Sequence, residues 1–375
     1  MRFIHTADWQ IGKVFRRFGD KDELFRRARL DAVETIGRTA HAEGAAHVLV
    51  AGDIYDAETP LGVTLRAPIE RMRRFTDVTW HLLPGNHDPH RPKGLWEQLA
   101  ASELPRNIRF HLEPEPVEIE AGTFLLPAPL ARKSETRDLT AWMDAAETPP
   151  GAVRIGLAHG AIIGFQGEGE ANNPIDPARA SRAGLAYLAL GDWHGTKRIA
   201  DRCWYAGTPE PDRMGGAAEG FALVVDAPSA IAIPQVRPVK VGRFRWVSHA
   251  ATLTDDGDLD AIEREIRGFE SLSAIVLRLQ LDGLLSIEGR RRLDAMLERL
   301  DANVCHLIRD VDRVRARPTL EDLEAIDFGG VLRQAAHRLQ DRLGHPGLTP
   351  DEARVAERAL IKLCLMGIEP AEAAS

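Results

Sequence analysis

One recurring pattern constrains the fold of this chain more than any other feature. A short apolar run, typical of a β-strand, is followed within a few residues by Asp, Asn or His. The runs lie at residues 2–5, 47–51, 79–83, 153–158 and 187–190, and stretches with helical spacing lie at 21–43 and 61–75. Strands that alternate with helices predict a layered α/β domain over about the first 240 residues.

The polar residues behind these runs are of the types that bind divalent metal ions. They stand in Asp8-Trp9-Gln10, Gly52-Asp53-Ile54-Tyr55-Asp56, Gly85-Asn86-His87-Asp88, Ala158-His159-Gly160 and Gly191-Asp192-Trp193-His194. Open α/β sheets bind ligands at the carboxyl ends of their strands, so we expect these residues to converge. Alone, each motif is more typical of a turn. Together they predict a site for two divalent ions with a carboxylate able to bridge them.

The rest of the chain predicts two further parts. Around 234–241 two prolines interrupt the pattern, and we place a domain boundary at 240. Residues 241–316 read as a small α+β unit with helices at 259–269 and 287–300 and strands at 274–281 and 304–308. Residues 317–375 read as helical, with Thr319 and Thr349 as N-caps followed by Asp322 and Glu352. A glycine-rich stretch at 164–174 reads as a loop beside the site, either a substrate gate or an idle surface loop.

Composition limits the partners and the compartment. The net charge is −8, of which 251–375 carry −7 and 1–250 carry −1. Bulk charge therefore does not favour nucleic acid, yet the nearly neutral first part does not exclude a polyanionic substrate. The three cysteines contain no C-x-x-C, which argues against a disulfide framework or a thiolate zinc site. No apolar run approaches the ~20 residues of a membrane span and no signal peptide is evident, so we expect a cytoplasmic protein.

The motifs resemble a known family. The matching segments are His5-Thr6-Ala7-Asp8-Trp9 with Ile11-Gly12, residues 51–56 with Thr59-Pro60, Pro84-Gly85-Asn86-His87-Asp88, and Tyr205-Ala206-Gly207-Thr208-Pro209. They are similar to the calcineurin-like metallophosphoesterases, and among these to the SbcD-type DNA repair exonuclease family. The resemblance covers about 1–240 well and 241–316 loosely. It implies a four-layer α/β sandwich with a small α+β cap and a C-terminal helical segment.

The resemblance also implies roles for individual residues. Asp8, Gln10 and His194 would bind one metal ion, Asn86, His159 and Asp192 the other, and Asp53 would bridge both. His87 would donate a proton to the leaving oxygen. The ions neutralise the charge of the phosphoryl oxygens, and an alkoxide leaves more easily when it is protonated.

Two positions depart from the family pattern, which has His where this chain has Gln10 and Asp192. Both can still bind a hard cation, Gln10 through its amide oxygen. Three carboxylates against two divalent ions leave a formal charge of +1, which favours Mn²⁺ or Mg²⁺ over Zn²⁺. We expect two ions, Mn²⁺ in the first place. A decayed site with one ion or none is the alternative.

Other residues near the motifs have two interpretations each. Asp56 and Asp88 either orient a ligand imidazole or a loop, or are ordinary turn carboxylates. The segment Phe15, Arg16, Arg17, Phe18 combines charge and aromatic rings, which predicts contacts with a nucleic-acid backbone and an unpaired base.

The sequence thus predicts a manganese-dependent phosphodiesterase that acts on DNA as an exonuclease, an endonuclease or both, in DNA repair. A small-molecule or cyclic-nucleotide phosphodiesterase, and a non-catalytic subunit of the same fold, are the alternatives. The resemblance implies a SbcC-like coiled-coil ATPase as a second partner, docked on 317–375. A homodimer stays open, and no membrane contact is expected.

Overall fold

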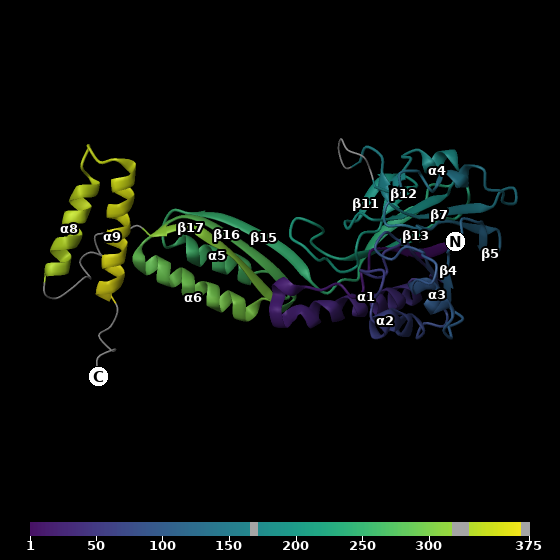
Figure 1. Cartoon of the computed structure of the whole chain (residues 1–375), viewed down its shortest axis with the longest axis horizontal. Coiled ribbons are helices and arrows are strands. Elements are labelled where there is room, and N and C mark those ends of the chain that lie inside the picture. The colour runs from purple at the N-terminus through teal and green to yellow at the C-terminus, as the bar shows by residue number, and fades with distance from the viewer. Residues whose placement is uncertain (166–171, 317–329, 369–375) are drawn as a thin grey trace. The chain divides into compact units, whose positions relative to one another are not determined.

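The computed structural model describes residues 1–165, 172–316 and 330–368, and divides into two compact units, Met1–Trp246 and Val247–Ser375 (Figure 1). The division in the chain falls after Trp246, slightly beyond the boundary predicted at 240. The predicted division at 316 stays a prediction.

The first unit contains a six-stranded sheet built around β1. Its order is β14 (Gln235–Lys240), β13 (Phe221–Asp226), β1 (Arg2–Thr6), β2 (His47–Val50), β3 (Thr79–Leu82) and β4 (Ile108–Phe110). β1 to β4 are parallel, and β13 pairs with β1 antiparallel. The strands predicted at 2–5, 47–51 and 79–83 are confirmed. Their almost continuous apolar runs are explained by burial on both faces.

A second six-stranded sheet faces the first. Its order is β11 (Lys197–Ala200), β12 (Cys203–Tyr205), β10 (Tyr187–Gly191), β7 (Val153–His159), β6 (Thr123–Ala128) and β5 (Val117–Glu120). A two-stranded sheet of β8 (Ala161–Ile162) and β9 (Pro174–Ile175) follows β7. The strands predicted at 153–158 and 187–190 are confirmed.

Three apolar clusters define the layers of this unit. The first places α1 (Asp22–Ala42), α2 (Gly62–Met72) and α3 (Leu95–Ala100) against the outer face of the first sheet. The second lies between the sheets, where Leu49 meets Leu157. The third covers the second sheet with α4 (Arg179–Arg182) and the 3₁₀ turn Ala141–Asp144. Side chains thus fill both faces of each sheet, and both sheets end at a common polar edge.

Helix α1 matches the helix predicted at 21–43 and closed by Gly44. Its buried residues Phe25, Ala32 and Ile36 recur at helical spacing on one face. Gly44 has φ +64°, the left-handed conformation that ends many helices.

The proline-rich stretch at 234–241 corrects one prediction. It is a strand, β14, paired along its whole length with β13. β14 has only one neighbour, and at a sheet edge the missing N–H of Pro238 costs no ladder bond. The prolines therefore mark an edge strand here, and the first sheet extends up to the end of the first unit.

Three buried histidines form a ladder across adjacent strands of the first sheet. His47 Nδ1 lies 3.0 Å from His81 Nε2, and His81 Nδ1 lies 2.9 Å from His111 Nε2. Each neutral imidazole has one donor and one acceptor, so a proton added to any member sets N–H against N–H. Burial, with smaller contributions from neighbouring cations, lowers the pKa of His81 well below its usual value and that of His111 to about 4.

This ladder should make the first unit acid-sensitive. A histidine whose pKa falls on folding contributes stability at pH values above its unfolded pKa of 6.5. This contribution is lost as the pH falls below 6.5. For one histidine with a folded pKa of about 4, the unfolding free energy should fall by about 2 kcal/mol between pH 7.5 and pH 5. All seven tryptophans lie in residues 1–246, so urea unfolding followed by tryptophan fluorescence reports this unit.

The variant His111→Gln keeps a hydrogen-bonding side chain and cannot titrate, so its unfolding free energy should fall by about 2 kcal/mol less over this range. His90→Gln, outside the ladder, is the control and should follow the parent. Identical pH profiles for His111→Gln and the parent would contradict the ladder's role.

The second unit holds a three-stranded sheet of β15 (Arg245–Leu253, whose first residues precede the division), β16 (Ile275–Leu285) and β17 (His306–Ala316). α5 (Asp258–Arg267) and α6 (Ile287–Asn303) pack on it through one apolar cluster. The predicted strand at 304–308 is longer than expected. Its charged second half pairs with β16 and keeps Val311 and Val314 in the core.

Two helices, α8 (Val331–Leu343) and α9 (Pro350–Ile368), end the described chain. The predicted cap at Thr349 is confirmed: its hydroxyl donates to Glu352, whose N–H points back to it at 3.4 Å. The cap predicted at Thr319 and the centre of the 164–174 stretch lie outside the described residues. In the part that the structure describes, no helix is long and apolar enough to cross a membrane.

Candidate metal centre

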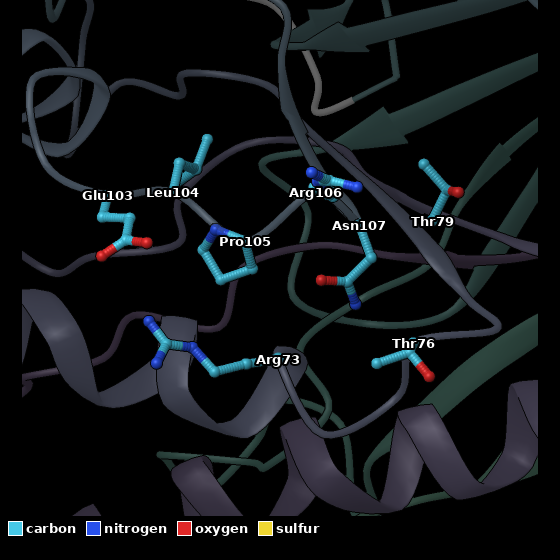
Figure 2. Close-up of a pocket in the computed structure, with 8 residues that line it drawn as sticks. All are labelled: Arg73, Thr76, Thr79, Glu103, Leu104, Pro105, Arg106 and Asn107. Atoms are coloured by element: carbon cyan, nitrogen blue, oxygen red, sulfur yellow. The ribbon is translucent and has the colours of Figure 1, made fainter.

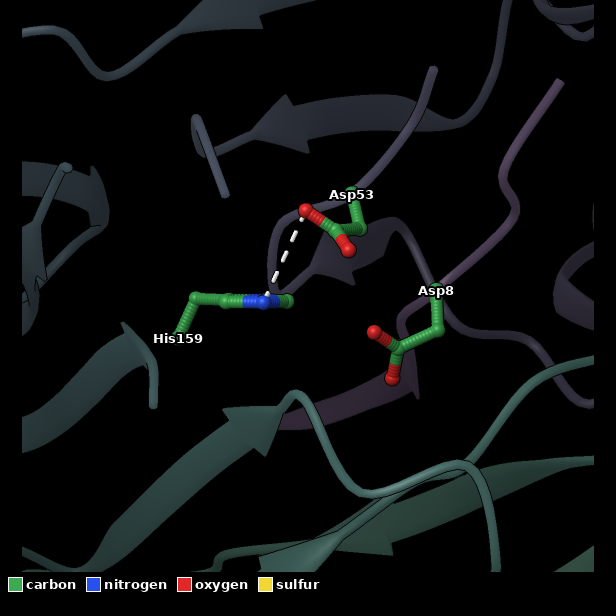
Figure 3. A group of neighbouring side chains, drawn as sticks. All are labelled: Asp8, Asp53 and His159. Carbon is green, nitrogen blue, oxygen red and sulfur yellow. Dashed lines mark ion pairs between the residues drawn. The ribbon is translucent and has the colours of Figure 1, made fainter. Parts of the chain in front are cut away.

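The predicted ligands converge at the carboxyl ends of strands from both sheets. Asp8 follows β1, Asp53 follows β2 and His159 ends β7. One ligand atom from each of these three lies within 4.8 Å of the others, and all three residues are buried. Figure 3 shows the carboxylates of Asp53 and Asp8 and the imidazole of His159 around one region. This group is the centre of the candidate site.

The backbone at the site is held in an unusual conformation. In the described residues, seven positions other than glycine have positive φ, and four of them are predicted ligands: Asp8, Gln10, Asp53 and Asp192. L-residues rarely adopt this conformation, and such strain concentrates at functional sites. Gly52 has φ +86°, and a Cβ there would lie 2.3 Å from His159 Nδ1. The loop thus needs glycine for the imidazole to pack against it.

Asp53, Asn86 and His159 offer a matched set of donor atoms. His159 Nδ1 lies 2.8 Å from the carbonyl oxygen of Ala51, which only accepts, so Nδ1 carries the proton and Nε2 presents a lone pair. Asn86 Oδ1 lies 2.8 Å from that Nε2, and Asp53 Oδ1 lies 3.6 Å from it. With its oxygen inward, the Asn86 amide faces acceptors only, an arrangement that a cation between them satisfies; the rotated amide would instead donate to Asp53 and to His159 Nε2. A hard divalent cation fits this donor set.

Asp8 and Asp192 add negative charge beside this set. The N–H of Asp192 donates to both oxygens of Asp8, at 3.1 and 3.2 Å, and Asp192 Oδ1 lies 3.8 Å from His159 Nε2. Burial raises the pKa of Asp8 to about 6 and also raises that of Asp192. Although burial lowers the pKa of His159, the carboxylates of Asp53, Asp8 and Asp192 raise it to about 9. The centre therefore favours a bound positive charge.

His87 is placed at the rim of the cluster. Its Nδ1 lies 3.0 Å from the carbonyl oxygen of Asp56, so Nδ1 donates there. Its Nε2 lies 3.9 Å from Asp53 Oδ2, and its backbone N–H donates to Asp53 Oδ1 at 2.8 Å. The side chain of Asp56 lies 4.0 Å from His87 Nδ1. Asp56 thus orients this imidazole through its backbone, with its carboxylate nearby.

Asp88 joins two of the ligand loops. Its buried carboxylate accepts the N–H of Tyr55 at 3.0 Å and that of Gly85 at 2.6 Å. Tyr55 follows Asp53 in the chain, and Gly85 precedes Asn86. The geometry therefore matches the interpretation of Asp88 as a residue that orients the loops.

Gln10 and His194 face a different set of partners. Lys13 Nζ donates to Gln10 Oε1 at 2.7 Å, and Gln10 Nε2 lies 3.3 Å from His194 Nε2. The amide oxygen predicted to bind an ion is thus engaged by an ammonium group. Asp212 lies on the other side, with Oδ2 2.5 Å from Lys13 Nζ and 3.6 Å from His194 Nδ1.

Sequence reasoning missed Asp212, whose side chain is almost fully buried. Burial alone would raise the pKa of this carboxyl, but contacts with His194, Arg29 and Lys13 hold it well below its usual value. Arg29 is also buried and donates to the carbonyl oxygen of Trp9 at 2.7 Å. The spacing of the apolar residues in α1 indicates that Arg29 is buried, because it puts this residue on the inner face of the helix.

The segment from Phe15 to Phe18 corrects another prediction. Both rings are 4% exposed, and they pack with Phe25 and with the Trp246 ring of the same unit. Buried rings present no face to a base, so the stacking role predicted for them is wrong for this structure. Arg16 and Arg17 are exposed, and a contact with a nucleic-acid backbone stays a prediction for them.

A surface hollow of about 640 Å³ lies elsewhere on the first unit (Figure 2). It is lined by Arg73, Thr76, Thr79, Glu103, Leu104, Pro105, Arg106 and Asn107. Thr79 begins β3 and Asn107 precedes β4, so the hollow lies at the amino ends of these strands. The metal centre lies at their carboxyl ends, and the hollow is not part of it.

Comparisons with known proteins cover the segments that form this site. Residues 1–180 match the calcineurin-like phosphoesterase family. The SbcD chain of the nuclease SbcCD from Bacillus subtilis (strain 168) is 26% identical over 328 residues, 73% of this chain and 81% of that protein. The SbcD chain of SbcCD from Rhodobacter capsulatus is 34% identical over 93 residues, 24% of this chain and 22% of that protein.

A solved structure, that of TT1561 from Thermus thermophilus, covers 64% of this chain and 98% of its own, at 13% identity and a TM-score of 0.42. The family match includes the loops of Asp8, Asp53, Asn86 and His159. Residues 1–180 therefore carry the features of the calcineurin-like phosphoesterase family, and the chain is distantly similar to SbcD nuclease subunits over most of its length.

Proposed function

We propose that this protein is a metal-dependent phosphodiesterase that cleaves DNA, and that Met1–Trp246 is its catalytic four-layer α/β sandwich. The observation that carries the proposal is the convergence of Asp53, Asn86 and His159 donor atoms beside the buried carboxylate of Asp8 and the partly exposed carboxylate of Asp192. Buried carboxylates, an imidazole lone pair and an amide oxygen are costly to gather unless they bind a cation.

The chain's own residues divide the work at this site. Asp53, Asn86 and His159 would hold the ion, and Mn²⁺ suits their oxygen-rich set. A bound divalent ion supplies positive charge for the phosphoryl oxygens and makes water more acidic. His87, oriented by the carbonyl oxygen of Asp56, has Nε2 directed toward the cluster and donates a proton to the leaving oxygen when it is doubly protonated.

DNA as the substrate is supported by the distant similarity to SbcD subunits, which extends over 73% of the chain. Arg16 and Arg17 are exposed residues in the segment that follows the Gln10 loop, and their positive charge suits phosphate contacts, although the Arg17 guanidinium already donates to the carbonyl oxygen of Asp212 at 2.7 Å. A small-molecule or cyclic-nucleotide phosphodiesterase, or a non-catalytic subunit, would keep the same fold.

Hydrolysis assays separate these functions. The full chain, stripped of metal by a chelator and reloaded with Mn²⁺, should cleave both a nitrophenyl phosphodiester and linear DNA, and the chelated protein should cleave neither. Cleavage of the small ester and cyclic nucleotides without cleavage of DNA would favour the small-molecule enzyme. No hydrolysis of any phosphodiester by metal-loaded protein would refute the proposal.

We also propose that residues 317–375 serve association, with a SbcC-like coiled-coil ATPase as the partner, while 241–316 form the cap. Within the second unit, Ala336 of α8 and Leu360 of α9 are buried with Ile287, whereas Val331 of α8 and Val355 of α9 are exposed apolar residues that a partner could cover. Their segment contains none of the metal motifs.

A chain truncated after Ala316 should therefore keep phosphodiesterase activity within about threefold, because every donor of the metal centre lies before residue 200. It should lose self-association or binding to a coiled-coil ATPase, measured by light scattering and by co-purification with that ATPase. Lost hydrolysis in a truncated protein whose circular dichroism shows an intact fold would contradict this assignment.

A further inference from the structure

Four side chains at one end of the metal centre contact one another in a closed ring, defined here as the Lys13 ring: Lys13, Gln10, His194 and Asp212. Lys13 Nζ donates to Gln10 Oε1 at 2.7 Å and to Asp212 Oδ2 at 2.5 Å. Gln10 Nε2 lies 3.3 Å from His194 Nε2, and His194 Nδ1 lies 3.6 Å from Asp212 Oδ2. Gln10 and His194 are two of the three residues that the resemblance assigns to one ion.

The donors and acceptors of this ring fix the orientation of the Gln10 amide. An ammonium group only donates, so the atom that faces Lys13 Nζ must be the amide oxygen. The NH₂ group then points to His194, and an NH₂ group cannot bind a cation. Rotating the amide by 180° would bring the oxygen inward but would set NH₂ against the Lys13 ammonium.

The same contacts engage His194. Gln10 donates to its Nε2, so the lone pair that would bind an ion already accepts a hydrogen bond. The proton of His194 then lies on Nδ1, the nitrogen that faces the Asp212 carboxylate. Of the three residues assigned to this ion, only Asp8 keeps its oxygens turned to the cluster, where they accept the N–H of Asp192.

Formal charges agree with this interpretation. The donor and ring carboxylates Asp8, Asp53, Asp192 and Asp212 contribute −4, and the cations Lys13 and Arg29, both paired with Asp212, contribute +2. The ammonium of Lys13 thus already lies at this end of the cluster, where it would repel a second divalent ion in the same place.

We propose that this chain binds a single divalent ion, at Asp53, Asn86 and His159, and that the Lys13 ring occupies the place of the second ion of the family's pair. The residues present do not fit a second ion, and the ammonium of Lys13 supplies positive charge there instead. The inference rests on the proposed function only for the presence of the first ion.

Manganese binding by the full chain tests this without any assay of activity. Apo protein titrated with Mn²⁺ and followed by electron paramagnetic resonance should take up one equivalent, and its spectrum should show an isolated ion without exchange coupling. Two equivalents with a coupled spectrum would overturn the inference. If that protein also cleaves DNA, the proposed function stands; if no Mn²⁺ binds at all, both fail.

Variants test the part played by the ring. Lys13→Met combined with Gln10→His removes the ammonium and adds an imidazole donor, so uptake should rise from one to two equivalents with a coupled spectrum. Lys197→Met, an exposed position outside the ring, is the charge-matched control and should stay at one. A folded double variant that still binds one ion would overturn the role of the ring. If the double variant does not fold, the stoichiometry of the parent protein decides.

Discussion

Replacing Asp53 by alanine should abolish both metal uptake and hydrolysis. Asp53 lies at the centre of the donor cluster, with Oδ1 3.6 Å from His159 Nε2 and Oδ2 3.9 Å from His87 Nε2. The change removes a buried carboxylate between two imidazoles, so the cluster loses both a ligand and the negative charge that attracts a cation. We expect phosphodiesterase activity to fall by roughly 10³-fold or more. Calorimetry or elemental analysis measures the metal.

Two further variants make this result specific. Asp53→Asn keeps an oxygen that can accept the N–H of His87, which Asp53 Oδ1 accepts at 2.8 Å. This variant therefore separates loss of the carboxylate charge from collapse of the loop. Asp56→Asn removes one negative charge from the neighbouring position, outside the donor set, and should change metal affinity by less than about tenfold. Stoichiometric metal binding by Asp53→Ala would refute the ligand role of this residue.

The local pattern was enough to predict where the donors would meet. Each of Asp8, Asp53 and His159 follows or ends a strand whose apolar run is unambiguous, and parallel strands bring their carboxyl ends to one edge. The strand ends therefore follow from local sequence, and so does the position of Asn86. The roles of these residues as ligands stay a proposal, because periodicity places a residue at an edge and says nothing about the direction of its lone pairs.

The parts that sequence reasoning missed depend on contacts between distant segments. Asp212 lies 199 positions from Lys13, and only the folded chain brings them within 2.5 Å. The orientation of the Gln10 amide depends on that lysine, so the prediction that its oxygen binds an ion rested on the residue type alone. The histidine ladder was also missed, because each of its members occupies an ordinary strand position and the contacts cross three strands.

Replacing His87 by alanine should lower activity in a way that depends on the leaving group. Nδ1 of His87 is held by the carbonyl oxygen of Asp56, so only Nε2 is directed toward the cluster and can protonate a departing oxygen. A DNA alkoxide needs that proton, whereas nitrophenolate is already a stable anion. General acid catalysis contributes roughly 10²- to 10⁴-fold, so we expect a loss of that size on DNA and a loss below about tenfold on the nitrophenyl ester.

Metal content separates this role from a structural one. The backbone N–H of His87, which the alanine variant keeps, binds Asp53, so the imidazole can be removed without loss of that contact and bound Mn²⁺ should be unchanged. His90→Ala, a half-buried histidine three residues along, is the matched control and should leave both rates near those of the parent. If His87 only shapes the loop, its removal displaces Asn86 and slows both substrates equally, with loss of metal. Equal losses on DNA and on the nitrophenyl ester would therefore decide against proton donation, since misplacement of a ligand does not distinguish between leaving groups.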